Sequence, residues 1–360
     1  MSNMTEILTR AEFSHDDIVK LLSAEGDDLK TLFDFAKNVK NQHVGNKVYL
    51  RGLVEYSNKC RKNCFYCGIR SGNANVSRYT VGEDEVVQAA VYIRKLGYGS
   101  MVLQSGELMT EKFVEDIERI LKRIHEATDH QIGITLSLGE QTEETFRRWF
   151  DAGAKRYLLR IESSNRELYY RLHPNDDTHS YENRLKSLKL LRKTGYQVGS
   201  GVMIGLPFQT LDNLAEDLLF LKNIDVDMVG MGPYIEHDET PLYRYRNLLP
   251  SPETRLELSL KMVAILRIMM NDINIAATTA LQTLDPMARE KALMVGANIV
   301  MPNVTPQEFR EQYFLYQNKT VVHDDAFTYH SQLEKSLNAI GCEIGYQAHG
   351  DSRHFAKRNS

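Results

Sequence analysis

Eight short apolar segments alternate with amphipathic stretches along most of the chain. We predict strands at residues 47–57, 100–107, 132–138, 156–162, 197–205, 227–235, 274–279 and 298–303. We predict helices between them, for example at residues 84–95, 142–152, 182–194, 211–223 and 252–270. Several of these helices end in glycine just before the next strand, as in KLGYGS and MVGANIV. Glycine is favoured there because it adopts the left-handed conformation without a steric penalty. The alternation predicts parallel strands joined by helical crossovers.

Eight such units predict an α/β fold, a TIM-type (β/α)8 barrel. A doubly wound open sheet is the alternative. Glycine and polar residues collect where the predicted strands end: Gly106 and Glu107, Ser137 and Gly139, Arg160 and Glu162, Thr278 and Thr279, and Asn303. In a barrel the carboxyl ends of all strands meet on one face, where active sites are built. We therefore expect the functional site on that face.

The segments that flank the predicted barrel have patterns of their own. Residues 1–46 are expected to form two N-terminal helices, the first opened by a capping box of Ser14 and Asp17. The barrel then occupies residues 47–305, and residues 306–360 form a closing helix and a C-terminal appendage. No linker is long or polar enough to divide the chain, so we expect a single domain.

Composition limits the class of protein. The chain of 360 residues has a formal charge of −4, so it has no broad attraction for nucleic acid. No apolar run reaches the roughly 18 residues of a membrane span, and the first residues lack the apolar core of a signal peptide. We therefore expect a cytoplasmic protein with neither a nucleic-acid nor a membrane partner. Thiols stay reduced in the cytoplasm, so clustered cysteines there more often bind metal than form disulfides.

Three of the four cysteines lie within eight residues, in the loop CRKNCFYC that follows the first predicted strand. Cys60, Cys64 and Cys67 can each reach a different iron of a cubane iron–sulfur cluster. The fourth iron then lacks a protein ligand and is open to an exogenous one. A structural zinc site, the alternative, requires four ligands, and the loop contains no histidine. Cys342 stands alone and is interpreted as an inert thiol.

The motif CxxxCxxC resembles the signature of radical S-adenosylmethionine (SAM) enzymes. The resemblance implies that the three loop cysteines hold one [4Fe-4S] cluster and that SAM chelates its open iron. It also implies that an electron from the cluster cleaves SAM to a 5′-deoxyadenosyl radical. By the same likeness Tyr66 lies beside the adenine, while Gly106 and Glu107, at the end of QSGE, receive the amino group of SAM.

Further stretches, among them TLSLGE, MIGLPFQT, AATTA and GANIVMPN, resemble the HydE family of [FeFe]-hydrogenase maturases. This resemblance implies that Ser137, Glu162 and Arg184 help to hold SAM. Arg184 would face the SAM carboxylate, a pairing that suits a guanidinium group. The substrate cavity would be lined by Thr135, Arg160, Met228, Thr278, Thr279, Met301 and Tyr313. Plainer alternatives are that the two methionines are barrel core and that Arg184 is a solvated helical arginine.

The HydE resemblance also implies a substrate and partners. The substrate would be a small organometallic unit, an iron–carbonyl–cyanide complex bound to cysteine and delivered by the maturase HydG. Radical attack on it would lead toward the diiron subcluster that HydF later loads. The alternatives are a related radical SAM enzyme of the methylornithine synthase type and a non-enzymatic iron–sulfur scaffold.

Two features of the cysteine distribution bear on these alternatives. Some HydE proteins carry a second cysteine cluster near the C-terminus, but residues 318–336 contain no cysteine, so we predict a single cluster. Biotin synthase, a relative with the same barrel, needs extra barrel cysteines for a sulfur-donating cluster. Residues 100–303 contain none, which argues against that activity.

Overall fold

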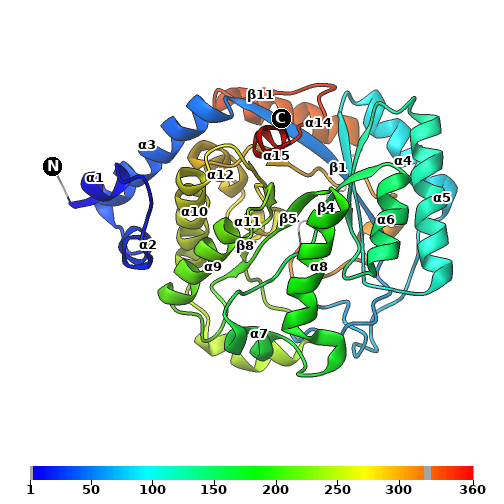
Figure 1. Cartoon of the computed structure of the whole chain (residues 1–360), viewed down its shortest axis with the longest axis horizontal. Coiled ribbons are helices and arrows are strands. Elements are labelled where there is room, and N and C mark those ends of the chain that lie inside the picture. The colour runs from blue at the N-terminus through cyan, green and yellow to red at the C-terminus, as the bar shows by residue number, and fades with distance from the viewer. Residues whose placement is uncertain (1–2, 320–325, 360) are drawn as a thin grey trace.

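Parallel strands form the centre of the structure, a computed structural model that describes residues 3–319 and 326–359. Within these residues the strands neighbour one another in the order β10–β1–β2–β3–β4–β5–β7–β9. Their bounds are β1 (Lys47–Ser57), β2 (Ser100–Ser105), β3 (Gly133–Ser137), β4 (Ala154–Leu158), β5 (Gln197–Ser200), β7 (Met228–Val229), β9 (Asn274–Ile275) and β10 (Ile299–Val300). The amide of Asn298 donates to the carbonyl of Ile275 (2.9 Å), which joins β9 to β10 and closes the sheet. The predicted (β/α)8 barrel is confirmed (Figure 1).

Two of the predicted strands are interrupted by close contact between their backbones. The predicted strand at 197–205 divides into β5 and β6 (Met203–Ile204), and that at 227–235 into β7 and β8 (Gly232–Pro233). β6 and β8 pair with each other in a separate small sheet. A Cβ at Gly201 would lie 2.0 Å from the carbonyl oxygen of Gly230, so only glycine fits at this break.

Helices cover the outside of the barrel, as Figure 1 shows. The helices that follow the strands are α4 (Glu83–Lys95), α5 (Glu111–Ala127), α6 (Glu143–Asp151), α8 (Tyr181–Thr194), α9 (Leu211–Asn223), α10 (Pro252–Met269) and α12 (Ala288–Val295). The predicted helices agree with α4, α6, α8, α9 and α10 to within two residues at either end. Shorter elements lie in the connections: α7 (Arg166–Leu172), η1 (Asp177–His179), η2 (Pro241–Leu248) and α11 (Thr279–Leu284).

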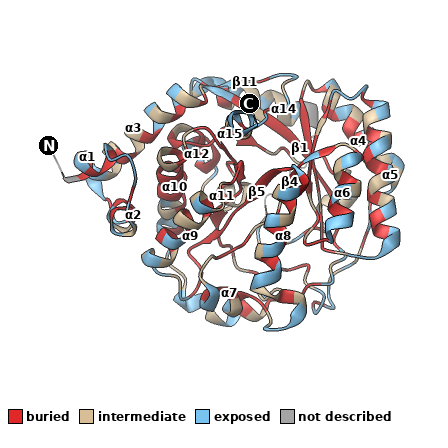
Figure 2. Ribbon diagram, in the orientation of Figure 1, coloured by how far each residue is buried: buried red, intermediate tan, exposed pale blue. Residues whose placement is uncertain are grey.

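The N-terminal segment contains three helices instead of the two predicted: α1 (Asn3–Leu8), α2 (His15–Leu22) and α3 (Gly26–His43). The predicted capping box opens α2, because Ser14 Oγ accepts from the amide of Asp17 (3.2 Å) and Asp17 Oδ2 accepts from the amide of Ser14 (3.0 Å). Both α2 and α3 contact α10. Figure 2 shows that α10 is buried along most of its length, as expected for a helix covered on both sides.

The C-terminal segment has parts at both ends of the barrel. Its first helix, α13 (Gln307–Arg310), lies near the carboxyl end of β1, where Asn58 Nδ2 donates to the carbonyl of Gln312 (2.8 Å). The later elements, α14 (Ala326–Ala339), β11 (Glu343–Ile344), which pairs with the start of β1, and α15 (Arg353–Arg358), close the end where the strands begin. Between β11 and α15 the chain crosses the barrel axis. The carbonyl of Gly350 accepts hydrogen bonds from Arg51 Nη2 of β1 (3.0 Å) and from Asn274 Nδ2 of β9 (2.8 Å).

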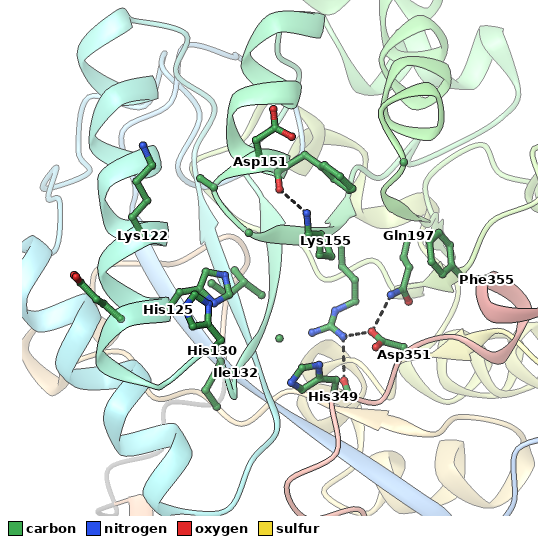
Figure 3. A pocket seen from close by; sticks show the side chains of 18 residues that line it. Lys122, His125, His130, Ile132, Asp151, Lys155, Gln197, His349, Asp351 and Phe355 are labelled. Carbon is green, nitrogen blue, oxygen red and sulfur yellow. Dashed lines mark hydrogen bonds and ion pairs between the residues drawn. The ribbon is translucent and has the colours of Figure 1, made fainter. Parts of the chain in front are cut away.

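The side chain of Asp351 also helps to close this end of the barrel. Its Oδ1 accepts hydrogen bonds from Gln197 Nε2 of β5 (2.8 Å) and from Arg156 Nη1 of β4 (2.6 Å), as Figure 3 shows. Arg156 also donates to the carbonyl of His349 (3.0 Å). A cavity of about 1020 Å³ opens beside these residues, between the ends of α5 and α6 and the C-terminal segment. It lies at the opposite end of the barrel from the cysteine loop.

No helix within residues 3–319 and 326–359 combines the length and the apolar character needed to cross a membrane.

Candidate functional site

The cysteine loop leaves the carboxyl end of β1 and opens onto a cavity of about 240 Å³ at the top of the barrel. Cys60, Cys64 and Cys67 all line this cavity. The other walls come from the ends of β2, β3 and β4, from α8 and from residues 313–316. The site is therefore built on the face where the strand ends predicted it, although the cavity at the other end of the barrel is larger.

The segment 172–179 holds the cysteine loop along its length. The amide of Phe65 donates to the carbonyl of Leu172 (2.8 Å), and the amide of Asn63 donates to His179 Nε2 (2.8 Å). Lys62 Nζ donates to the carbonyl of Thr178. The Nδ1 of His179 lies 2.7 Å from Asp176 Oδ1, which fixes the tautomer that leaves Nε2 free to accept. Sequence reasoning missed this segment, because nothing local in its sequence signals the contact.

Gly106 lies directly under the start of the loop. A Cβ at this position would be 2.4 Å from the carbonyl oxygen of Lys59 and 2.7 Å from Cys60 Cβ. The end of β2 therefore approaches the first cysteine so closely that only glycine fits. The amide of the next residue, Glu107, donates to Cys60 Sγ (3.3 Å).

Replacing Gly106 by alanine is expected to displace Cys60, because overpacking of this kind costs about 1–3 kcal/mol. We expect the iron retained after anaerobic reconstitution to fall by about tenfold, a factor that corresponds to about 1.4 kcal/mol. Gly230→Ala is the matched control, because a Cβ there meets the side chain of Leu158 at ordinary distances of 3.7 Å (Cδ2) and 3.9 Å (Cδ1). Equal iron retention in the two variants would contradict the steric account.

Glu107 has partners within the protein. Its Oε1 accepts from Arg61 Nε (2.9 Å), and its Oε2 accepts from the amide of Glu140 (2.8 Å). Lys62 Nζ also lies 3.5 Å from Oε1. A ligand amino group that approaches Glu107 would therefore share a carboxylate that already ties the cysteine loop to the end of β3.

Arg184 is buried, with 7% of its surface exposed, so it is not the solvated helical arginine of the plainer reading. It projects from α8 into the cavity. Its Nε donates to Glu140 Oε1 (2.5 Å), and its Nη1 donates to the carbonyl of Arg160 (2.5 Å).

Burial alone would raise the pKa of Glu140, but Arg184 and Lys62 hold that pKa below its ordinary value. Glu140 was not singled out from the sequence.

Glu162 lies past the end of β4, because this strand stops at Leu158 and does not reach 162 as predicted. Its φ of 67° is in the left-handed region, a strained conformation for glutamate that occurs often at functional sites. Arg160 Nη2 lies 2.9 Å from Glu162 Oε2, but the pair is not aligned as a hydrogen bond, so Oε2 has no hydrogen-bond partner. Burial raises the pKa of Glu162. This oxygen is ion-paired with Arg160 and keeps the capacity to accept a hydrogen bond from a ligand hydroxyl or ammonium group.

The remaining predicted residues fall into three groups. Tyr66, Ser137, Arg160 and Tyr313 line the same cavity as the cysteines. Thr135, Met228 and Met301 line a smaller space of about 30 Å³ deeper in the barrel. Thr278 and Thr279 line neither, although Thr279 Oγ1 lies 3.3 Å from the hydroxyl of Tyr316, which lines the upper cavity.

The residues present fit a cubane cluster. Burial raises the pKa of all three loop thiols, that of Cys64 to about 12, so a positively charged metal group is needed to make them thiolates. In the described part of the chain, no three His, Cys, Asp or Glu side chains are close enough to hold a single metal ion. A cubane offers each thiolate a different iron, so the three thiols need not meet at one ion. Cys342 is buried near Lys40, far from this loop.

Comparison with known proteins gives consistent matches. Residues 54–221 match the Radical SAM superfamily. The chain is 40% identical over 353 residues to the [FeFe] hydrogenase maturase subunit HydE of Thermotoga maritima, which covers 97% of each protein. It is 26% identical over 346 residues to 3-methylornithine synthase of Methanosarcina acetivorans, and this alignment covers 95% of this chain and 93% of the synthase. The crystal structure of methylornithine synthase (PylB) superposes with a TM-score of 0.80 at 22% identity, over 96% of this chain and 97% of that one.

Proposed function

The chain belongs to the radical SAM superfamily, in the family of HydE hydrogenase maturases, and from this premise we propose that it acts in the assembly of the [FeFe]-hydrogenase active site. Its substrate would be an iron–carbonyl–cyanide–cysteine precursor of the diiron subcluster. The observation that supports this most directly is the identity of 40% to a HydE protein along almost the whole chain. Membership of an enzyme family excludes the non-enzymatic scaffold.

The cofactors of the proposal are one [4Fe-4S] cluster and SAM. When bound, the cluster supplies the electron that cleaves the sulfonium of SAM and yields a 5′-deoxyadenosyl radical. Cys60, Cys64 and Cys67 would hold the cluster. The SAM contacts would come from Tyr66, Gly106, Glu107, Ser137, Glu162 and Arg184, all of which line the cavity that the cysteines share.

Each SAM contact has a chemical role that its surroundings support. Arg184 would pair with the carboxylate of SAM, since its guanidinium is buried and its Nε and Nη1 are fixed by hydrogen bonds to Glu140 and to the carbonyl of Arg160. Glu162 would accept a hydrogen bond at Oε2, which is ion-paired with Arg160 but accepts no hydrogen bond within the described residues. Tyr313, of which 1% is exposed, forms a buried part of the cavity wall and would help to keep water and stray hydrogen donors from a primary radical.

The substrate would enter the same barrel from above. Arg160 and Tyr313 line the upper cavity, and Thr135, Met228 and Met301 line the space beneath it, so these five would contact the substrate along the barrel axis. Thr278 and Thr279 would contact the substrate only at the edge of this site. The partners would be HydG, which delivers the precursor, and HydF, which receives the product, both in transient contact.

The second candidate is a carbon-skeleton rearrangement of the methylornithine synthase type. The observation that favours it is the sequence identity of 26% over 346 residues to 3-methylornithine synthase of Methanosarcina acetivorans. The higher sequence identity to HydE, 40% against 26%, favours hydrogenase maturation.

The proposal is tested with anaerobically reconstituted protein. Electron paramagnetic resonance of the reduced cluster should change on addition of SAM, and 5′-deoxyadenosine should be released. The reconstituted protein is then added to a maturation mixture that contains HydG, HydF and apo-hydrogenase, and hydrogen production is measured. Formation of 3-methylornithine in a cell extract, with no activation of hydrogenase, would reject the proposal in favour of the second candidate. A resonance signal that does not change on addition of SAM would reject both candidate functions.

A further inference from the structure

Glu140 lies where three parts of the site meet, although it belongs to none of the expected SAM or substrate contacts. It follows the end of β3, one residue after Gly139, whose φ of 78° turns the chain away from the barrel axis. The amide of Glu140 donates to Glu107 Oε2 (2.8 Å). Its carboxylate binds Arg184 Nε through Oε1 (2.5 Å) and Lys62 Nζ through Oε2 (3.1 Å).

All members of this group are buried. The exposed fractions are 3% for Lys62, 4% for Glu107, 6% for Glu140 and 7% for Arg184. A buried ion pair adds little net stability over apolar residues of similar volume, but removal of one partner leaves an uncompensated charge. Glu140 is the only residue of this group whose side chain contacts both the cysteine loop and α8.

We propose that Glu140 is a positioning residue that sets the guanidinium of Arg184 for the carboxylate of SAM and at the same time fixes the cysteine loop through Lys62. The inference rests on the SAM site proposed above. Because Glu140 Oε1 holds Nε and the carbonyl of Arg160 holds Nη1, the guanidinium is fixed in one orientation, and Nη2 is the nitrogen that makes no hydrogen bond within the described residues. This leaves Nη2 for a carboxylate in the cavity that Arg184 lines. The carboxylate links the geometry of the SAM site to that of the cluster loop.

The proposal requires both carboxylate oxygens of Glu140, so it can be tested by substitution with an amide, which provides only one oxygen. Glutamine keeps one acceptor oxygen and places an NH2 group where the second cation lies. Glu140→Gln therefore loses either the Arg184 or the Lys62 contact without a change of volume. Glu140→Asp keeps the charge, but its shorter side chain cannot reach both partners.

SAM affinity of the reconstituted cluster is the quantity to measure, by titration followed in the electron paramagnetic resonance spectrum. Glu140→Gln is expected to weaken SAM binding about tenfold, since a hydrogen bond between charged groups is worth about twice a neutral one. Glu140→Asp should fall between this variant and the wild type. Glu143→Gln is the matched control, because Glu143 lies three residues away on the surface and pairs only with Lys193 (2.6 Å).

A double-mutant comparison separates positioning from general stability. In an Arg184→Ala background, Glu140→Gln should reduce SAM affinity by less than it does with Arg184 present, since interacting positions are not additive, and the loss that remains is the part carried through Lys62. An equal tenfold loss in both backgrounds would show that Glu140 does not act through Arg184 and would overturn the inference. Wild-type affinity in both Glu140 variants would overturn it as well.

The SAM titrations distinguish failure of the proposed function from failure of the inference about Glu140. Neither titration requires the organometallic substrate or a partner maturase. If the wild-type protein binds SAM and Glu140→Gln binds it equally well, only the inference about Glu140 fails. If the wild-type cluster does not respond to SAM at all, the proposed function and this inference fail together.

Discussion

Replacing any one of Cys60, Cys64 and Cys67 by alanine should abolish SAM cleavage. Each thiolate would bind a different iron, so the loss of one leaves two ligands for a cluster that already has an open position. The nearby backbone cannot compensate, because Gly106 and the segment 172–179 fix the loop in one conformation. Iron and sulfide content after anaerobic reconstitution, and 5′-deoxyadenosine formed on reduction with SAM, are the quantities to measure.

Cys342→Ala is the matched control for these three variants. Cys342 is 5% exposed and lies 4.0 Å from Lys40 Nζ, in contact with none of the cavity residues. We expect its replacement to change neither iron content nor cleavage. Survival of SAM cleavage in any loop variant, or loss of iron in Cys342→Ala, would show that the ligands have been assigned wrongly.

The features that could be predicted from sequence are those with a local signal. The helix–glycine–strand alternation repeats at short range, so it located the start of each strand and both ends of α4, α6, α8, α9 and α10 to within two residues. The predicted ends of β4, β5, β7, β9 and β10 were too late by three or more residues. The capping box at Ser14 is also local. The short helix α1 was missed because its six residues are too few to show a period. Strands β5 and β7 ended early where Gly201 and Gly230 meet, a contact between distant positions.

The residues of the candidate site also divide into those with a local sequence signal and those without one. The cysteines and Glu107 lie in motifs, but the residues that hold the motif loop are far from it in sequence. Asn63 and His179, for example, are 116 positions apart, and no period connects them. Glu140 lies in the TLSLGE stretch from which Ser137 was chosen, and only the fold shows that its carboxylate lies between Lys62 and Arg184.

Removal of residues 345–360 is expected to destabilise the protein severely, although these residues lie at the end of the barrel opposite the site. The truncation deletes the carbonyl groups of His349 and Gly350 and the carboxylate of Asp351. Arg51 and Arg156 would then remain inside the barrel with half of their hydrogen bonds lost, since Arg51 keeps only Met228 Sδ and Arg156 keeps only Thr135 and Ser100. Both are buried, with exposed fractions of 4% and 1%.

The size of the effect follows from the groups left without partners. Each unsatisfied buried polar group costs about 1–3 kcal/mol, and more when it is charged. Arg51, Arg156, Asn274 and Gln197 all lose acceptors, so the total approaches the roughly 5–15 kcal/mol of a typical folded protein. We expect the truncated chain to be largely unfolded or aggregated at temperatures where the full chain is folded, as measured by circular dichroism and size-exclusion chromatography.

A single substitution keeps the prediction testable if the truncated chain cannot be purified. Asp351→Ala removes one acceptor from Arg156 and Gln197, and because its side chain is 49% exposed we expect a loss of only about 1–3 kcal/mol. Lys357→Ala, on the exposed side of α15, should cost less than about 1 kcal/mol. SAM cleavage at low temperature should survive in Asp351→Ala, since the cavity of the cysteines is at the other end of the strands. If the truncated chain instead unfolds at the temperature of the full chain, the C-terminal segment lies on the barrel without stabilising it.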